Sequence, residues 1–355
     1  MNTTGPAPVP RPDAAGFDLL RRVELRAALE GLFSRVPSSP RIVDLDTRPF
    51  PYASSFAIEE VNVRFDDGSV LELVCKDTGE AAMLPEARRI KPRFLHNPLR
   101  EIATYERMLS PFAAGAPRFY GSAIDERRGR YWLFLERVRG VPLTEVGGFN
   151  VWRHVSGWLA AMHRRLARDP GFACAAVVVP LVSYDRELAR VWMERAQWYL
   201  DADQTHSRAD RLRFASLLWQ YERVLDEIAA LPAGFVHGEF FASNVMVETA
   251  AGQVRVCPVD WEVAGIGPML MDLAALTAGR WTEAERTELA VSYRAAANGD
   301  GGTSLSHADF MRALDCCRLQ LAVQRLGWAR RWTPPATHTQ DWLGEALAAA
   351  GRLGF

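Results

Sequence analysis

The sequence predicts a two-lobed α+β fold, in which a small β-rich N-terminal lobe precedes a larger helical C-terminal lobe. Apolar and polar residues alternate at strand spacing in much of 41–138, whereas apolar residues recur at helical spacing in most of the chain after Gly140. A short strand-and-loop island at 235–262 interrupts the predicted helices. We therefore expect a disordered lead-in at 1–15, an N-terminal lobe at 16–138 and a C-terminal lobe at 139–355.

Composition and charge narrow the class of protein. The 355 residues carry 42 basic and 43 acidic side chains, so neither nucleic acid nor a membrane surface is an expected partner. The five cysteines are scattered and form no Cys-x-x-Cys pair, which favours a reduced compartment. The N-terminus lacks the apolar segment of a secretory signal. We therefore expect a cytoplasmic protein.

The expected N-terminal lobe combines strands with two helices. Residues on either side of an Asp67-Gly68 turn alternate apolar and polar side chains, which predicts a β-hairpin. Pro98 is placed to open a helix, because proline is tolerated in the first turn. The predicted elements are a helix at 17–36, strands at 61–65 and 71–76, a helix at 98–109, and strands at 117–121 and 131–138.

The expected C-terminal lobe is mostly helical. Its predicted helices have the length and periodicity of amphipathic elements and lie at 152–167, 184–201, 208–230 and 307–332. The island contains two strand-like runs, 244–248 and 253–259, which a turn at Ala251-Gly252 separates. A loop held between helices in this way is a place where polar side chains can be positioned for chemistry.

The island carries two polar motifs. Residues 235–244 read Phe-Val-His-Gly-Glu-Phe-Phe-Ala-Ser-Asn, and residues 257–262 read Cys-Pro-Val-Asp-Trp-Glu. These motifs resemble the catalytic and metal loops of the aminoglycoside phosphotransferase family, which usually read His-Gly-Asp-x-x-x-x-Asn and Ile-Asp-Trp/Phe-Glu. The resemblance implies a bilobal protein-kinase-like fold and a nucleotide-dependent phosphotransferase that acts on an alcohol group.

Phosphoryl transfer explains these residue types at this spacing. One carboxylate must lie beside the attacking hydroxyl, while an amide and a second carboxylate hold Mg²⁺ against the phosphates. The resemblance assigns these roles to Glu239, Asn244 and Asp260, with ATP or GTP as the phosphate donor. It also implies that His237 supports the loop backbone and that Asp272 holds the catalytic loop in place. No P-loop, His-Glu-x-x-His or Gly-x-Ser-x-Gly motif supports a different chemistry.

The N-terminal lobe supplies the candidates for nucleotide binding. Lys76 ends a predicted strand, where kinase-like folds place the lysine that pairs with the nucleotide phosphates. Glu101 is its expected helix partner, with Glu106 as the alternative. Residues 133–143 resemble the family's hinge, whose backbone contacts the adenine edge, and the turn at 52–56 is expected to cover the phosphates. The full set of candidates is Lys76, Glu101, Ser54, Ser55, Glu136 and Val138.

The sequence departs from the family pattern at two places. Glu239 stands where the family usually has aspartate, and an extra methylene moves a carboxylate by about 1 Å or more, which can cost roughly 10²-fold in rate. The turn at 52–56 contains no glycine, although its serines can still donate hydrogen bonds. Three functions therefore stay open: a small-molecule kinase, a nucleotide-binding pseudokinase, and an enzyme that reuses the cleft with Glu239 as acid or base.

The acceptor is expected to be a small hydroxylated molecule, such as a sugar, an antibiotic or another metabolite. Aminoglycosides are polycations, yet the helices expected to face the substrate contain as many basic as acidic groups. This balance argues against a polycationic drug and leaves resistance, salvage and biosynthetic roles open. The basic residues are Arg186, Arg190, Arg195, Arg318, Arg325, Arg330 and Arg331. Four tryptophans are candidates for stacking on a substrate, although packing between helices is the simpler interpretation: Trp281, Trp328, Trp332 and Trp342.

Overall fold

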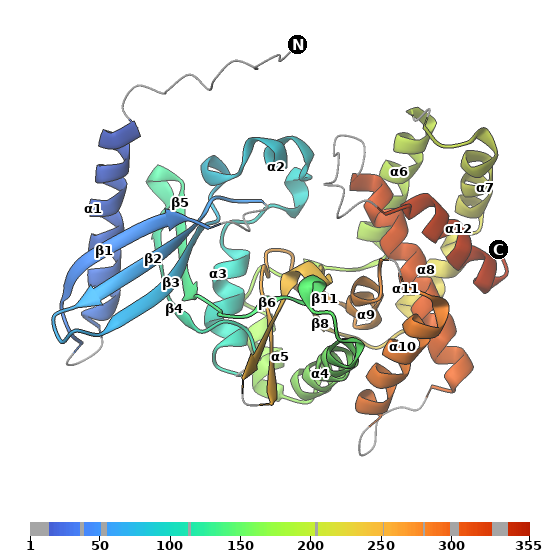
Figure 1. The fold of residues 1–355 in the computed structure, drawn as a ribbon. Coiled ribbons are helices and arrows are strands. Elements are labelled where there is room, and N and C mark those ends of the chain that lie inside the picture. Colours follow the sequence, from blue (N-terminus) through green and yellow to red (C-terminus); the bar gives the residue numbers. More distant parts are fainter. Residues whose placement is uncertain are drawn as a thin grey trace, which may run out of the picture.

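Figure 1 shows the computed structural model of the chain. It describes residues 14–35, 39–50, 55–112, 115–202, 205–250, 252–279, 281–298, 305–328 and 340–355. Residues 1–13 of the expected lead-in lie outside this part of the chain, as do Ser54, Arg330, Arg331 and Trp332. The first helix, α1 (Ala14–Phe33), begins within the last two residues of the expected lead-in.

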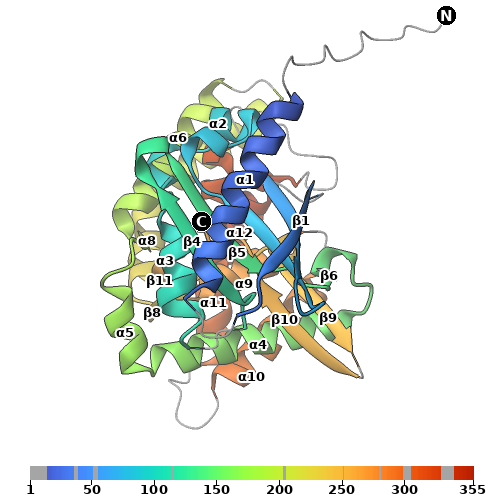
Figure 2. The same cartoon turned by 90° about the vertical axis from the view of Figure 1, so that its left-hand side faces the viewer.

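The N-terminal lobe is an antiparallel five-stranded sheet with the order β1-β2-β3-β5-β4. Its strands are β1 (Ile42–Pro49), β2 (Ile58–Phe65), β3 (Val70–Asp77), β4 (Phe119–Asp125) and β5 (Arg130–Glu136). The predicted hairpin is confirmed as β2 and β3, whereas β1 was not predicted. α1 runs across the sheet (Figure 2), and its Leu25 and Leu29 pack on Val61 and Val63 in one buried cluster. The alternation in β2 thus turns its apolar side towards α1.

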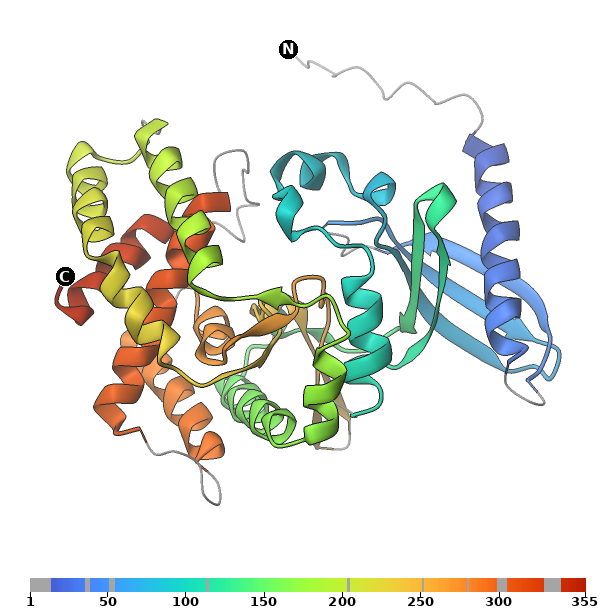
Figure 3. The same ribbon diagram turned by 180° about the vertical axis from the view of Figure 1, so that it is seen from behind.

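One helix of the first lobe lies between this sheet and the second lobe. α3 (Arg100–Thr104) continues into a π-helical turn at Tyr105–Leu109, so the helix predicted at 98–109 is confirmed in place but not in regular geometry. Figure 3 shows α3 between the sheet and the C-terminal helices. The connection from β3 contains α2 (Pro85–Ile90) and a 3₁₀ turn at Arg93–Leu95.

The C-terminal lobe is helical, as predicted, apart from two small sheets. Its helices are α4 (Phe149–Ala167), α5 (Pro170–Ala176), α6 (Arg186–Ala202), α7 (Arg208–Trp219), α8 (Tyr221–Ala229), α9 (Leu270–Leu276), α10 (Glu283–Ala297), α11 (His307–Trp328) and α12 (Trp342–Leu353). The single helix predicted at 208–230 is wrong, because the chain bends at Gln220 and forms α7 and α8. The two parts pack on different helices, α7 on α12 and α8 on α11.

The island forms strands that fix its loops. β9 (Val245–Ala250) and β10 (Gln253–Pro258) are the predicted pair, and β6 (Val141–Pro142) joins β9 on its other edge. A second sheet places β11 (Gly265–Pro268) between β7 (Val182–Ser183) and β8 (Ala233–Val236). The loops after β8 and β10 lie beside each other, since His237 Nε2 is 2.9 Å from the Val259 carbonyl.

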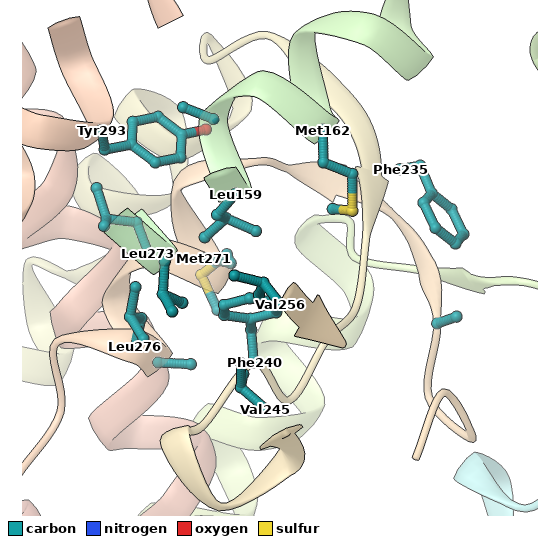
Figure 4. Close-up of a cluster of buried hydrophobic side chains, with 14 of the residues drawn as sticks. Leu159, Met162, Phe235, Phe240, Val245, Val256, Met271, Leu273, Leu276 and Tyr293 are labelled. Carbon is teal, nitrogen blue, oxygen red and sulfur yellow. The ribbon is translucent and has the colours of Figure 1, made fainter. Parts of the chain in front are cut away.

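An apolar core lies beneath the island. Figure 4 shows Leu159 of α4 and Leu273 of α9 gathered with Phe240, Val245 and Val256 from the island. All five side chains are buried. Close packing of this kind leaves little room for rearrangement, so the loops above it have a rigid base. In the part of the chain that the structure describes, no helix is long and apolar enough to cross a membrane.

Candidate active site

A buried cluster of charges joins three distant segments. Lys76 lies at the end of β3, and its Nζ is 2.7 Å from Glu101 Oε2 on α3. The same ammonium contacts Asp260 Oδ1 in the loop after β10. Both Lys76 and Glu101 are buried, whereas the alternative partner Glu106 lies on the surface beside Arg107. The structure therefore brings Lys76, Glu101 and Asp260 together.

The charge on this cluster follows from burial and from its two carboxylates. Burial lowers the pKa of Lys76, but the charges of Asp260 and Glu101 outweigh burial and raise it above the ordinary value. Burial opposes ionisation of Asp260 too, yet the attraction of Lys76 prevails and lowers the Asp260 pKa. At Glu101 burial prevails and raises the pKa. One lysine thus serves two carboxylates, and Asp260 keeps its negative charge.

Asp260 adopts a backbone conformation that few residues tolerate. Its φ is 66°, and among the described residues no other residue except glycine has a positive φ. Aspartate is one of the side chains that enter the left-handed region at modest cost. The next residue, Trp261, is buried, donates its N–H to Glu101 Oε1 at 3.2 Å and stacks on Phe235. Packing around Trp261 therefore holds Asp260 in this conformation, which turns its carboxylate towards Lys76.

Asp272 holds the loop after β8. Its Oδ2 accepts the N–H of His237 at 2.7 Å, and its Oδ1 accepts the N–H of Gly238 at 2.9 Å. Asp272 is fully buried at the start of α9, and His163 Nε2 of α4 lies 3.3 Å from Oδ2. A carboxylate that receives several such bonds is a strong local anchor. The backbone at His237 is therefore fixed from two helices.

His237 links this loop to the one that carries Asp260. Its Nε2 lies 2.9 Å from the carbonyl of Val259, and its Nδ1 lies 3.3 Å from the N–H of Glu239. These contacts fit a neutral ring with the proton on Nε2, because Nδ1 must accept. Burial lowers the pKa of His237 in spite of the nearby Asp272, which favours the same neutral form.

Glu239 has a partner that the sequence analysis did not identify. Its Oε1 accepts from Arg325 Nη2 of α11 at 2.8 Å. The Arg325 guanidinium also lies over the ring of Phe241, at 4.2 Å from the centroid. Arg325 appeared in the sequence only as one of several basic residues near the substrate side. No local sequence pattern indicated that Arg325 would pair with Glu239, because 86 residues separate the two.

The metal candidates are tied to the same loops. Asn244 Nδ2 donates to the carbonyl of Glu239 at 3.1 Å, which leaves the amide oxygen for a metal. The carbonyl of Asn244 accepts from Val259 N–H at 2.9 Å and so links the two loops. A carboxylate and an amide oxygen suit Mg²⁺, which usually takes one or two carboxylates and completes its octahedron with water and phosphate. The described residues contain no group of three or more His, Cys, Asp or Glu side chains that could hold a metal alone.

The family of the chain is decided by a comparison of its sequence. A model of the phosphotransferase enzyme family matches residues 62–314, which is well over half of the chain and includes Lys76, Asp260 and Asp272. The chain belongs to this family. It is accordingly a small-molecule phosphotransferase. No curated protein sequence matches the chain.

Solved structures of phosphotransferases share the fold. A GDP complex of an aminoglycoside 2'-phosphotransferase-IIIa variant has a TM-score of 0.58 at 12% identity, with 94% of this chain and 97% of that chain covered. A microcompartment-associated aminopropanol kinase has a TM-score of 0.56 at 15% identity, with 87% and 90% covered. An ethanolamine kinase from Plasmodium vivax has a TM-score of 0.55 at 10% identity, with 99% and 95% covered. The predicted bilobal, protein-kinase-like fold is confirmed.

A second pair of charges borders the site of this phosphotransferase. Lys91 Nζ lies 2.5 Å from Glu262 Oε2, and Ser55 Oγ donates to Glu262 Oε1 at 3.1 Å. Arg100 Nη1 donates to the Glu262 carbonyl at 3.0 Å. Ser55 and Phe56 are thus the residues of the predicted phosphate turn that the structure describes, and Ser55 reaches the loop of Asp260. The roles of Lys91 and Arg100 were missed, since nothing in their local sequence distinguishes them from surface charges.

The link between the lobes holds the two remaining nucleotide candidates. Glu136 receives both Nη atoms of Arg255 on β10, at 2.6 and 2.7 Å, and its N–H donates to the carbonyl of Arg118. Its side chain therefore joins the lobes, and the predicted nucleotide contact of Glu136 concerns its backbone and stays a prediction. Within the described residues, neither the N–H nor the carbonyl of Val138 has a backbone partner. Val138 thus keeps the polar backbone groups that an adenine edge requires.

The substrate side contains both packed and surface residues. Trp281 lies edge-on to Trp152 at 4.6 Å, and Trp328 stacks on Trp192 at 5.7 Å. Arg186 and Arg190 pair with carboxylates on α8, on an exposed face. The simpler interpretation of the tryptophans, packing between helices, therefore holds for Trp281.

Proposed function

We propose that this phosphotransferase moves the γ-phosphate of ATP or GTP to a hydroxyl of a small molecule. The observation that carries the proposal is the buried contact of Lys76 with both Glu101 and Asp260. Three segments, β3, α3 and the loop after β10, meet at this one ammonium. Kinase-like folds use a strand lysine paired with a helix carboxylate, next to a carboxylate that holds Mg²⁺, and these are the three groups that meet here.

Each candidate residue has a physical role in this proposal. Lys76 binds the phosphates of the nucleotide, and Glu101 keeps its ammonium in place. Asn244 and Asp260 would hold Mg²⁺, which supplies positive charge against the phosphates when bound. The Val138 backbone would bind the adenine or guanine edge. Lys76 leaves Asp260 for a phosphate when the nucleotide enters, because a phosphate is the more highly charged partner.

Glu239 is proposed to orient the acceptor hydroxyl and to take its proton. The support is its position: Asp272 and His237 fix the backbone that carries it, and Asn244 binds its carbonyl. The reaction needs a carboxylate whose placement does not change as substrates enter and leave. The hydrogen bonds of this loop supply that placement.

The ion pair with Arg325 favours a second candidate function. A carboxylate that already accepts from a guanidinium at 2.8 Å has one oxygen less for a substrate hydroxyl. A cleft that binds nucleotide without transfer would look the same. This alternative and the kinase differ in a measurable product.

The test uses the purified full chain in two steps. ATP and GTP, each at millimolar concentration with Mg²⁺, should raise the Tm, because a ligand that binds only the folded state stabilises it. A mixture of metabolites incubated with nucleotide labelled in the γ-phosphate should then yield a labelled acceptor. Failure of both nucleotides to raise the Tm contradicts the proposal. A Tm rise without labelled product supports the second candidate.

A further inference from the structure

Arg325 has hydrogen-bonding capacity that the protein does not use. Only its Nη2 reaches Glu239, while its Nε is buried and has no hydrogen-bond partner among the described residues. The side chain is 11% exposed. A buried N–H without an acceptor costs free energy that a ligand oxygen would recover. The unpaired edge of the Arg325 guanidinium therefore indicates that a ligand oxygen binds there, beside Glu239.

Two indoles near Arg325 repeat this feature. The ring of Trp328 lies 5.8 Å from the guanidinium and stacks on Trp192. Nε1 of each indole is buried and unpartnered within the described residues. Phe94, from the segment between β3 and α3, lies edge-on to Trp192 at 5.6 Å and brings the first lobe to this wall. Unpartnered arginine Nε atoms also occur at Arg286, Arg294 and Arg318. None of these three makes an ion pair with Glu239 or a cation–π contact with a tryptophan among the described residues.

The balance of donors and charges selects the ligand. The unused groups on Arg325, Trp192 and Trp328 are all N–H donors, so a ligand that meets them must supply oxygen acceptors. The rings of Phe241 and Trp328 flank the guanidinium. Arg195 is a second cation on the face of Trp192, and together these features favour a flat, anionic group. A planar guanidinium matches a carboxylate in this way. A phosphate dianion would place two further charges beside Glu239, whereas a carboxylate places one. Arg325 can lie between the two carboxylates and reduce their repulsion.

We propose that Arg325 binds a carboxylate of the acceptor, so that the substrate is a hydroxylated carboxylic acid with an apolar or aromatic portion. The proposal rests on the proposed function, because it places the acceptor hydroxyl at Glu239. Trp328, beside the guanidinium, would lie against the apolar portion of the substrate, with the fully buried Trp192 packed behind it. Arg325 is a specificity-determining residue in this scheme. Its guanidinium binds both the carboxylate of the substrate and Glu239, which receives the proton of the substrate hydroxyl.

The probe is benzoate, with benzamide and benzylamine as neutral and cationic counterparts of the same shape. Binding is followed through the indole N–H signals of ¹⁵N-tryptophan-labelled protein, assigned with Trp192→Phe and Trp328→Phe. Benzoate should shift both signals and bind at least about tenfold more tightly than benzamide, because a charged pair is the stronger hydrogen bond. Arg325→Gln should remove this preference. Arg325→Lys, which keeps the charge but loses the planar fork, should retain part of it.

The matched control is Arg312→Gln, on the same helix but paired with Glu227 at the surface. It should bind benzoate as the parent does. Equal binding of benzamide or benzylamine, no benzoate binding at about 10 mM, or an unchanged preference in Arg325→Gln each overturns the inference. The nucleotide-induced Tm rise, measured on the same samples, shows that the variants are folded. It also tests the proposed function separately, since nucleotide binding does not involve Arg325.

Discussion

Asp272 accepts the backbone N–H of Gly238 at 2.9 Å, and this bond fixes the loop at a position where only glycine fits. Gly238 has a φ of 84°. A Cβ at this position would lie 2.1 Å from Tyr184 Oη and 2.6 Å from the Val263 carbonyl oxygen. The loop that carries Glu239 can therefore approach Tyr184 and Val263 only because residue 238 is glycine.

Gly238→Ala should lower the free energy of unfolding by about 2–5 kcal/mol. A left-handed alanine costs about 1–2 kcal/mol, and overpacking adds about 1–3 kcal/mol. The matched control is Gly68→Ala, where φ is 82° but no atom lies within 4 Å of the added Cβ. It should show the strain alone, at about 1–2 kcal/mol. Denaturant midpoints of both variants give the comparison, and equal losses would mean that crowding at Gly238 is absent.

Sequence patterns predicted what neighbouring residues determine. The hairpin of β2 and β3, the strands of the island and the order of the polar motifs all depend on local alternation, turn residues and spacing. Lys76 and Glu101 were identified because their places in a strand and a helix are characteristic of kinase-like folds. The structure then brings both to Asp260.

Long-range packing produced what the sequence analysis missed. Glutamine does not break helices, so no local signal indicated the bend at Gln220. The chain bends there because α7 and α8 pack on different helices. Lys91 meets Glu262, and Arg325 meets Glu239, across separations that no periodicity encodes. Such pairs follow from the assembled fold, since an isolated charge on a helix looks the same whether it faces water or a carboxylate.

Asp260→Asn should remove Mg²⁺-dependent turnover and leave the protein folded. Asparagine tolerates the left-handed φ of 66°, whereas alanine would add backbone strain. Loss of a preorganised charge at a phosphate site costs roughly 10²- to 10³-fold in rate. Rates measured across a Mg²⁺ titration check this, with Asp44→Asn, which removes a surface partner of Arg64, as control. An unchanged rate and Mg²⁺ dependence in Asp260→Asn rules out the metal assignment.

His237 should make the fold less stable in mild acid. Its folded pKa lies below the ordinary 6.5, mainly because of burial. As the pH falls below 6.5, His237 becomes protonated in the unfolded chain but stays neutral in the folded chain. The contribution of His237 to stability is therefore complete above pH 6.5 and declines below it. The slope of this contribution cannot exceed about 1.4 kcal/mol per pH unit. His237→Gln, which cannot titrate, should show a shallower fall of Tm between pH 6.5 and 5.

The control for this effect is His307→Gln, because His307 is exposed. Its Tm should follow that of the parent at every pH. Other titrating groups contribute equally to parent and variant, so the difference between the two curves isolates His237. Parallel curves for His237→Gln and the parent would show that the pKa of the ring is the same in the folded and unfolded chains.

The identity of Glu239 should matter as much as its charge. Glu239 Oε1 meets Arg325 Nη2 at 2.8 Å, and a side chain one methylene shorter cannot keep this contact while the backbone stays bound to Asp272 and Asn244. Glu239→Asp should therefore lower kcat by roughly 10²-fold, the cost of a misplacement of about 1 Å. Glu239→Gln should lower it by roughly 10²- to 10⁴-fold through loss of the base. The nucleotide-induced Tm rise should be unchanged in both, because Glu239 does not contact the nucleotide in the proposed site.

The assay is transfer to an identified acceptor at saturating nucleotide. If Glu239→Asp instead equals or exceeds the parent, the site is not fitted to glutamate, and the second candidate function, nucleotide binding without efficient transfer, is the better description.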